Sequence, residues 1–169
     1  MNARSPVLDE AILSQILAAH CRPCDLPPVQ PGVLSNYFEK VGFAPRQVIA
    51  DIGEVGEALY IVVEGDAAIY QEASKEIEIA RIEHGELMGE MSFFDRSPRS
   101  VRIRAGKQGA QVLRLTRPMY ERLRVEVPQV AACLLEWTIV SLDHIFRRTS
   151  SHVAAVTQYV YGATSTHRR

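Results

Sequence analysis

The chain has 169 residues, of which 47% are hydrophobic, which is enough for one domain with a full core and helical extensions. Its formal net charge of -1 argues against a protein dominated by attraction to nucleic acid or to a membrane surface. The sequence opens without a signal peptide and has no run of about 18 apolar residues, so we expect a soluble, cytoplasmic chain without a membrane span.

Two short helices are predicted at the start of the chain. Residues 8–20 carry apolar side chains at helical spacing, and the four prolines within residues 22–31 end this pattern. Residues 32–40 are expected to form a second short helix. We therefore assign residues 1–31 to an N-terminal helix and a proline-rich linker that precede the main domain.

The three cysteines do not suggest the disulfide framework of a secreted protein. Cys21 and Cys24 have the spacing of a dithiol redox motif, but such a motif lies between a strand and a helix, and this pair follows a helix-like run. No second ligand pair at zinc-site spacing is evident. Two unpaired thiols are therefore the favoured interpretation, and a thiol-redox protein is an alternative.

The hydrophobic period changes from helical to strand-like near residue 41. Glycines separate four stretches that alternate or are rich in β-branched residues. These stretches are residues 41–53, 58–71, 75–87 and 100–116. Many short strands at this spacing predict a β-sandwich or jelly roll of about eight strands. Within them, residues 75–82 alternate isoleucine and alanine with polar residues, which predicts a half-buried strand or an edge hairpin.

Helical periodicity returns at Arg117. Residues 117–128 are expected to form a short helix with a proline in its first turn, where a missing N–H costs little. A long helix is then expected over residues 128–160. Its inward face should combine apolar residues with small hydroxyls: Leu134, Leu135, Thr138, Ser141, Leu142, Ile145 and Phe146.

This order of elements predicts an α+β fold. A β jelly roll would carry N-terminal helices, a short internal helix and a long C-terminal helix, all in one domain over residues 32–162. Residues 163–169 are polar and are expected to be a disordered tail.

The stretch GEMSFFDRSPRSV at residues 89–101 has the composition of an anion site. A helix that begins after Gly89 would direct free N–H groups at one point, and Arg99 could pair with two phosphate oxygens. A carboxylate at Glu90 would repel the same anion, so it fits best as an acceptor for a sugar hydroxyl. Phosphate and sugar hydroxyl together indicate a nucleotide. Spacing alone nevertheless favours a structural turn in which Glu90 pairs with Arg99.

Residues 89–101 also resemble the phosphate-binding cassette of cyclic nucleotide-binding domains, as found in catabolite activators and protein-kinase-A regulatory subunits. That family has G-E-x-[AS]-[LF], a short variable loop and P-R-[AST], and this chain has GEMSF at residues 89–93 and PRS at residues 98–100. Residues 51–60 resemble the family's glycine-containing turn before a strand. The resemblance covers roughly residues 33–150 and implies the family's jelly-roll fold with a short helix in the cassette.

The resemblance implies a role for each matching position. Glu90 would accept a hydrogen bond from the ribose 2′-hydroxyl, and Arg99 would bind the cyclic phosphate. Ser100 and the backbone of residues 89–92 would complete the phosphate cradle, and the long helix would cap the base. The expected ligand-binding residues are Gly89, Glu90, Met91, Ser92, Arg99, Ser100 and Val101, with Thr138 and Ser141 as candidate base contacts. Small residues that let helices pack closely explain Thr138 and Ser141 equally well.

The implied ligand is cAMP, slightly favoured over cGMP, and no metal or other cofactor is expected. Val101 departs from the family pattern, which has a small residue two places after the arginine. A larger side chain there could crowd the ligand. An interaction or dimerisation domain that keeps the fold with a degenerate pocket is therefore the alternative function.

No output module is recognisable after the long helix. A helix-turn-helix cannot be built from the residues that follow it, so direct DNA binding is not expected. No motif of an enzyme active site appears. We expect a regulatory module that signals to a partner, and the chain loosely resembles regulatory tails of bacterial sulfate-type transporters. Homodimerisation is expected through a seam of Leu135, Leu142 and Ile145.

Overall fold

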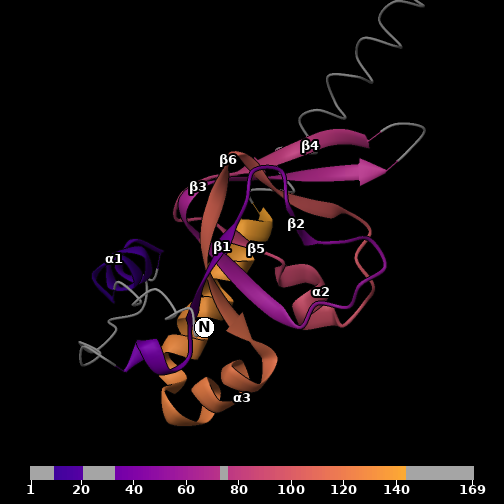
Figure 1. The fold of residues 1–169 in the computed structure, drawn as a ribbon. Helices are drawn as coiled ribbons and strands as arrows, with labels where there is room; N and C mark the ends of the chain where they lie inside the picture. The colour runs from indigo at the N-terminus through magenta and orange to yellow at the C-terminus, as the bar shows by residue number, and fades with distance from the viewer. Residues whose placement is uncertain (1–9, 21–32, 73–75, 144–169) are drawn as a thin grey trace, which may run out of the picture.

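The computed structural model describes residues 10–20, 33–72 and 76–143 (Figure 1). Two helical segments come first, then a β-roll interrupted by one short helix, then two further helices. The elements are α1 Glu10–His20, the 3-10 helix η1 Leu34–Asn36, β1 Glu39–Phe43, β2 Val48–Ala50, β3 Ala58–Glu72, β4 Glu76–Ile82, β5 Leu87–Met88, α2 Glu90–Asp95, β6 Arg102–Thr116, α3 Arg117–Glu126, and a helix over residues 128–143.

The described strands form one antiparallel sheet that curls into a roll. Their order is β1-β6-β3-β4, with β2 paired to β6 and β5 paired to β3. Strands β3 and β6 are 15 residues each and pair from Ala58↔Thr116 to Tyr70↔Arg102. The predicted α+β jelly roll is confirmed, with a long helix after the roll.

The described part of the chain contains six strands, fewer than the eight expected. Register shifts interrupt the β3–β6 pairing between Val62 and Glu64 and between Gly65 and Ala67. Such bulges bend a strand without ending it. Gly65 of β3 and Gly106 and Gly109 of β6 therefore lie inside two long, bent strands that pass through the whole roll.

Alternate residues of β3 face two separate cores. Leu59 and Ile61 belong to a cluster shared with the helices, whereas Val62 and Tyr60 face a second cluster inside the roll. This period of two is the expected consequence of strand geometry. The sheet thus has one face covered by helices and one face that lines the interior of the roll.

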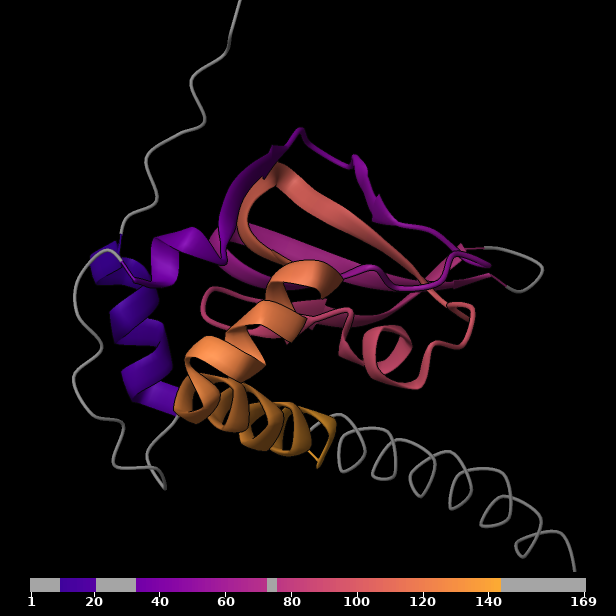
Figure 2. The ribbon, with the colours of Figure 1, turned by 90° about the horizontal axis from the view of Figure 1, so that it is seen from below.

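The helices gather on one side of the roll (Figure 2). Helix α1 contributes Leu13, Ile16 and Leu17 to the cluster that also contains Leu134 and Trp137 of the 128–143 helix. Between α3 and this helix, Val127 leaves helical geometry with φ -137° and ψ 63°. Pro128 explains the break, because proline disfavours helical geometry in the residue before it.

Two expectations for the first half of the chain have definite outcomes. The helix expected over residues 32–40 is wrong: only η1 is helical, and β1 already begins at Glu39. The strand expected over residues 75–82 is an edge hairpin, because β4 pairs only with β3 among the described strands and leaves Ile77 and Ile79 exposed.

Several expectations concern residues that the structure does not describe. They include Cys21, Cys24, Ile145, Phe146 and the tail at 163–169. Cys133 is fully buried and disulfide-bonded, a bond that the sequence analysis did not predict. Across residues 10–20, 33–72 and 76–143, no helix has the length and hydropathy needed to cross a bilayer.

Candidate functional site

The cassette begins at a glycine that the backbone requires. Gly89 follows β5 and has φ 85° and ψ 3°, a left-handed conformation that glycine adopts without steric cost. Helix α2 starts at the next residue and ends at Asp95, and the following residue, Arg96, is also left-handed at φ 59°. The chain therefore turns sharply before and after this short helix, and the turn at Gly89 directs the first residue of α2 inward.

That first residue, Glu90, is a buried carboxylic acid with an exposed fraction of 4%. Burial raises the pKa of Glu90, while its own backbone N–H and the positive charge of Arg99 act in the opposite direction. Burying a carboxylate is costly unless hydrogen bonds or a charge compensate it. The site thus holds a strong hydrogen-bond acceptor with little solvent around it.

Arg99 is the second buried ionisable residue of the cassette, with an exposed fraction of 9%. Its backbone is fixed by two hydrogen bonds to the preceding loop, from the Arg99 N–H to the Glu54 carbonyl and from the Gly53 N–H to the Arg99 carbonyl, both 2.9 Å. The ion pairs found among the described residues do not include Arg99. The turn stabilised by a Glu90–Arg99 pair, which spacing alone favoured, is therefore not what the structure contains.

The guanidinium group of Arg99 lies between two glycines. A methyl group added at Gly56 would lie 2.9 Å from Arg99 Nη2, and one added at Gly89 would lie 3.4 Å from the same atom. Both glycines allow a close approach of backbone to the arginine. The Arg99 side chain is thereby held beside the start of α2, where Glu90 also lies.

Ser92 connects α2 to the loop in front of it. Its hydroxyl accepts a hydrogen bond from the Gly56 N–H at 2.7 Å and donates one to the Ser97 carbonyl at 2.6 Å. Both contacts are within the protein, so this hydroxyl holds the cassette together. The role expected for the backbone of residue 92 in a phosphate cradle stays a prediction.

The remaining candidate residues differ in position. Met91 is 62% exposed, Ser100 is exposed, and Val101 is half-buried. Thr138 is buried, and its hydroxyl donates to the Leu134 carbonyl at 2.8 Å, which is a helix-internal contact. Ser141 is half-buried on the same helix. The structure thus brings Gly89, Glu90, Ser92 and Arg99 together, and leaves the Thr138 hydroxyl engaged elsewhere.

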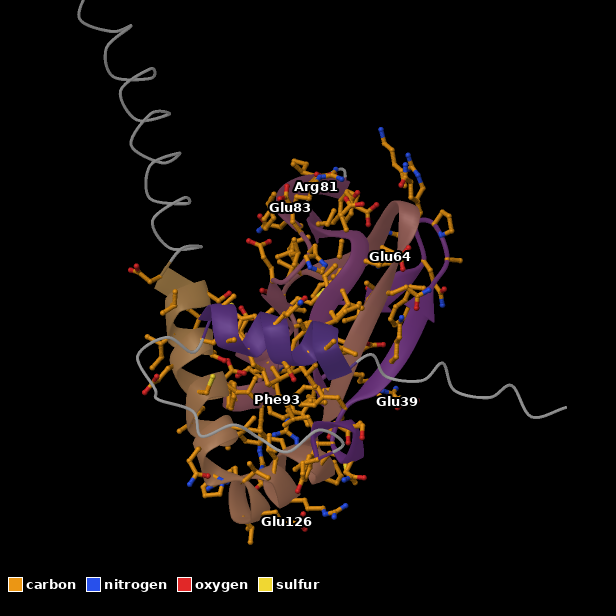
Figure 3. All side chains as sticks on the ribbon, turned by 90° about the vertical axis from the view of Figure 1, so that its left-hand side faces the viewer. Glu39, Glu64, Arg81, Glu83, Phe93 and Glu126 are labelled. Atoms are coloured by element: carbon orange, nitrogen blue, oxygen red, sulfur yellow. The ribbon has the colours of Figure 1, made fainter. Side chains whose placement is uncertain are left out.

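An aromatic cluster ties the cassette to α3. Phe93 is fully buried and makes edge-to-face contacts with Phe94 and Tyr120, with ring centroids 5.2 and 5.5 Å apart. Such pairs add to the stabilisation that burial provides. Figure 3 shows Phe93 deep in the molecule, where the helices meet the sheet.

Sequence reasoning missed three residues around the site. Gly56 was seen only as a turn glycine, although its close contact with Arg99 explains why no side chain fits there. Tyr60 faces the interior of the roll; burial raises its pKa, and the charges of Arg114 and Arg99 lower it. Arg117 contacts both the loop that contains Gly56 and helix α2. No local spacing signals these contacts, because they join segments far apart in the sequence.

The described residues include no cluster of three or more His, Cys, Asp or Glu side chains that could hold a metal ion. The site instead combines a buried arginine, a buried acid and a glycine-bordered helix start, inside a β-roll that precedes a long helix. This is the architecture of a cyclic nucleotide-binding domain. The family model of the cyclic nucleotide-binding domain matches residues 40–125, half of the chain, and the chain belongs to that family.

Curated relatives are regulatory and receptor proteins. The chain is 31% identical to the cyclic AMP receptor protein of Thermus thermophilus over 108 residues, which are 63% of this chain and 50% of that protein. It is 26% identical to a cAMP-dependent protein kinase regulatory subunit of Emericella nidulans over 98 residues, 58% of this chain and 23% of that protein. The chain thus matches half or less of the length of these relatives.

A solved structure supports the fold independently. A cyclic nucleotide-binding domain from Methylobacillus flagellatus superimposes with a TM-score of 0.72, covering 87% of this chain and 84% of that chain at 18% identity. At this identity the likeness concerns the fold alone.

Proposed function

We propose that this chain binds a cyclic nucleotide in the cassette at residues 89–101 and acts as its sensor. The observation that carries the proposal is Arg99, nine-tenths buried and outside every ion pair of the described residues. A buried guanidinium is strongly stabilised by an anion that accepts two of its N–H groups, and a cyclic phosphate is such an anion. Family membership supports the same ligand class.

Glu90 is the residue that favours a nucleotide as the ligand. A buried carboxylate next to a phosphate site is repelled by the phosphate, so it needs a donor from the ligand. The ribose 2′-hydroxyl of a cyclic nucleotide supplies one, because it can donate a hydrogen bond to Glu90 while the phosphate faces Arg99. The backbone of residues 89–92 and the Ser100 hydroxyl would provide further donors to the phosphate oxygens.

Among cyclic nucleotides, cAMP is the proposed ligand and cGMP the second choice. The two curated relatives described above carry cAMP or cyclic AMP in their names, which supports the first choice. Val101 is half-buried, and the alternative function remains a domain that keeps the fold but binds no nucleotide because this side chain narrows the site.

The output is proposed to pass through the helix over residues 128–143. This helix exposes Leu135 at 42%, Ile139 at 67% and Val140 at 52%. Apolar side chains on one exposed helix face favour a protein partner, and we propose a second copy of this chain as the dimer partner. An effector, such as a transporter to which this module would report, is the proposed recipient of the signal.

Calorimetric titration of the purified chain with cAMP, cGMP and cyclic di-GMP tests the proposal and identifies the ligand. Saturable one-to-one binding of cAMP per chain, tighter than that of the other two, is the expected result. Saturable binding of another member of the panel would retain the sensor and change its signal. The absence of binding with all three would favour the non-binding scaffold.

A further inference from the structure

Arg117, the first residue of α3, binds two backbone carbonyls from separate parts of the site. Its Nη2 donates to the Gly56 carbonyl at 2.5 Å and to the Phe93 carbonyl at 2.8 Å. Its guanidinium also lies over the Phe93 ring, 4.5 Å from the centroid. The Arg117 backbone N–H donates to the Glu57 carbonyl at 2.9 Å, so main chain and side chain fix the same loop.

Both of these carbonyls belong to segments that touch the proposed phosphate site. Gly56 is buried, and a methyl group added there would lie 2.8 Å from the Phe93 nitrogen and 2.9 Å from Arg99 Nη2. The Gly56 N–H is already bound to the Ser92 hydroxyl. The N–H of Gly56 is therefore held by Ser92 and its carbonyl by Arg117. The residue itself lies directly against the Arg99 side chain.

We infer that Arg117 is a positioning residue for cyclic nucleotide binding, an inference that rests on the proposed function. It holds the Gly56 loop and α2 in the arrangement that places Arg99 and the first N–H groups of α2 around one phosphate. Because Arg117 is also the start of α3, the same contacts connect the cassette to the helices that follow.

The ion pair of Arg117 with Glu57 does not account for this residue. The Nε–Oε2 distance is 3.4 Å, and the Glu57 side chain is 74% exposed, whereas that of Arg117 is 18% exposed. Exposed pairs of this kind contribute little. Two carbonyls that lose their donor inside the protein have a larger effect, because a backbone acceptor left without a hydrogen bond is costly.

The test compares Arg117→Met with Arg124→Met. Both arginines lie on α3, but among the described residues Arg124 pairs with the exposed Glu121 side chain alone and stacks on Tyr120 at 6.0 Å. Calorimetric affinity for cAMP is expected to fall at least about tenfold in Arg117→Met and to stay within about twofold of the wild-type value in Arg124→Met. Equal affinities in all three proteins would overturn the inference.

A double-mutant cycle separates positioning from general destabilisation. In the Arg99→Lys background, which keeps a charge but loses the fork of two donors, Arg117→Met is expected to lower cAMP affinity less than it does in the wild-type background. Non-additivity of this kind shows that the two residues act on one interaction. Fully additive losses would assign Arg117 a structural role only and contradict the inference.

Amide hydrogen exchange without ligand provides a readout that does not need binding. Arg117→Met is expected to increase exchange within residues 53–57 and 89–99 while residues 110–115 of β6 keep wild-type protection. Uniformly faster exchange, or no change in these two segments, would overturn the inference. If the wild-type chain binds no cyclic nucleotide, the proposed function fails, and this exchange pattern still decides whether Arg117 positions the cassette.

Discussion

Glu90 and Arg99 carry the two charges of the site without forming an ion pair with each other in the described structure. Burial opposes the charge of Glu90, and only its own N–H and the nearby arginine favour it. Such an arrangement lowers the stability of the ligand-free protein. It suits a ligand that brings one anion for the arginine and one hydroxyl for the acid.

The Glu90→Gln variant tests the claim that the buried Glu90 carboxylate lowers the stability of the ligand-free protein. Burial raises the pKa of Glu90 in the folded state above its ordinary value of 4.5, so the folded protein binds a proton more readily than the unfolded chain. The free energy of unfolding should therefore decrease as the pH rises from about 4.5 through the raised pKa, and glutamine should remove this decrease. Thermal unfolding between pH 4 and pH 8 should show a higher Tm for the variant at neutral pH.

The same variant should bind cyclic nucleotide less tightly, by roughly tenfold, because a neutral amide is a weaker acceptor than a carboxylate. A variant that is less stable than the wild type at neutral pH would contradict the argument from burial. Unchanged affinity would remove Glu90 from the ribose contact.

Gly56→Ala tests the close approach of the loop to Arg99. The added methyl would meet the Phe93 nitrogen and the Arg99 side chain at under 3 Å, and crowding of a packed site typically costs about 1–3 kcal/mol. Gly42→Ala is the matched control, since the atoms nearest to its methyl would be the end of the flexible Gln111 side chain. Urea unfolding should separate the two variants by at least about 1 kcal/mol, and equal midpoints would show that the loop relaxes freely.

At the scale of elements, α2 and α3 form one connected unit. Phe93 and Phe94 of α2 pack against Tyr120 of α3, and Arg117 binds the carbonyl of Phe93. A shift of the cassette on ligand binding would therefore move the start of α3. Such a shift is a signal only if the ligand prefers one position of the helices over another.

The exposed face of the 128–143 helix makes a prediction about assembly. Replacing Leu135 and Ile139 together by glutamine should convert a dimer into a monomer, because both side chains are exposed in the single chain and their loss leaves its core intact. Val125→Gln is the control, since Val125 is 82% exposed and lies on α3 and not on this helix. Light scattering measures the masses, and a wild-type chain that is monomeric with and without cAMP would refute dimerisation.

The whole molecule shows which features a sequence can reveal. The cassette was recognisable because Gly89, Glu90 and Arg99 lie within one short stretch, so their types and spacing survive in the linear order. The contacts of Arg117 with Gly56 and Phe93 were not, because they span 61 and 24 residues and depend on how the roll closes. The described residues form fewer strands than expected for a related reason: glycines at bulges look like glycines at turns.

The sequence also did not predict correctly which side chains of the 128–143 helix are buried. Leu135 was assigned to the apolar face together with Leu134, but the structure buries Leu134 and exposes Leu135. Adjacent residues on a helix point in directions about 100° apart, so a broad apolar stripe does not say which edge meets the core. Tertiary packing against α1 decides this, and the packing is invisible in the sequence of the helix alone.

The most direct test of the central claim is a thermal-shift measurement with cAMP on the wild-type chain and on Arg99→Ala, with Arg124→Ala as control. Ligand at about 100 times its Kd adds about 2.7 kcal/mol, which raises the Tm of a domain of this size by roughly 5–10 °C. We predict this shift in the wild type and the control and its loss in Arg99→Ala. A shift that persists in Arg99→Ala, or no shift in any of the three proteins, would contradict the assignment of Arg99 as the phosphate-binding residue of a cyclic nucleotide sensor.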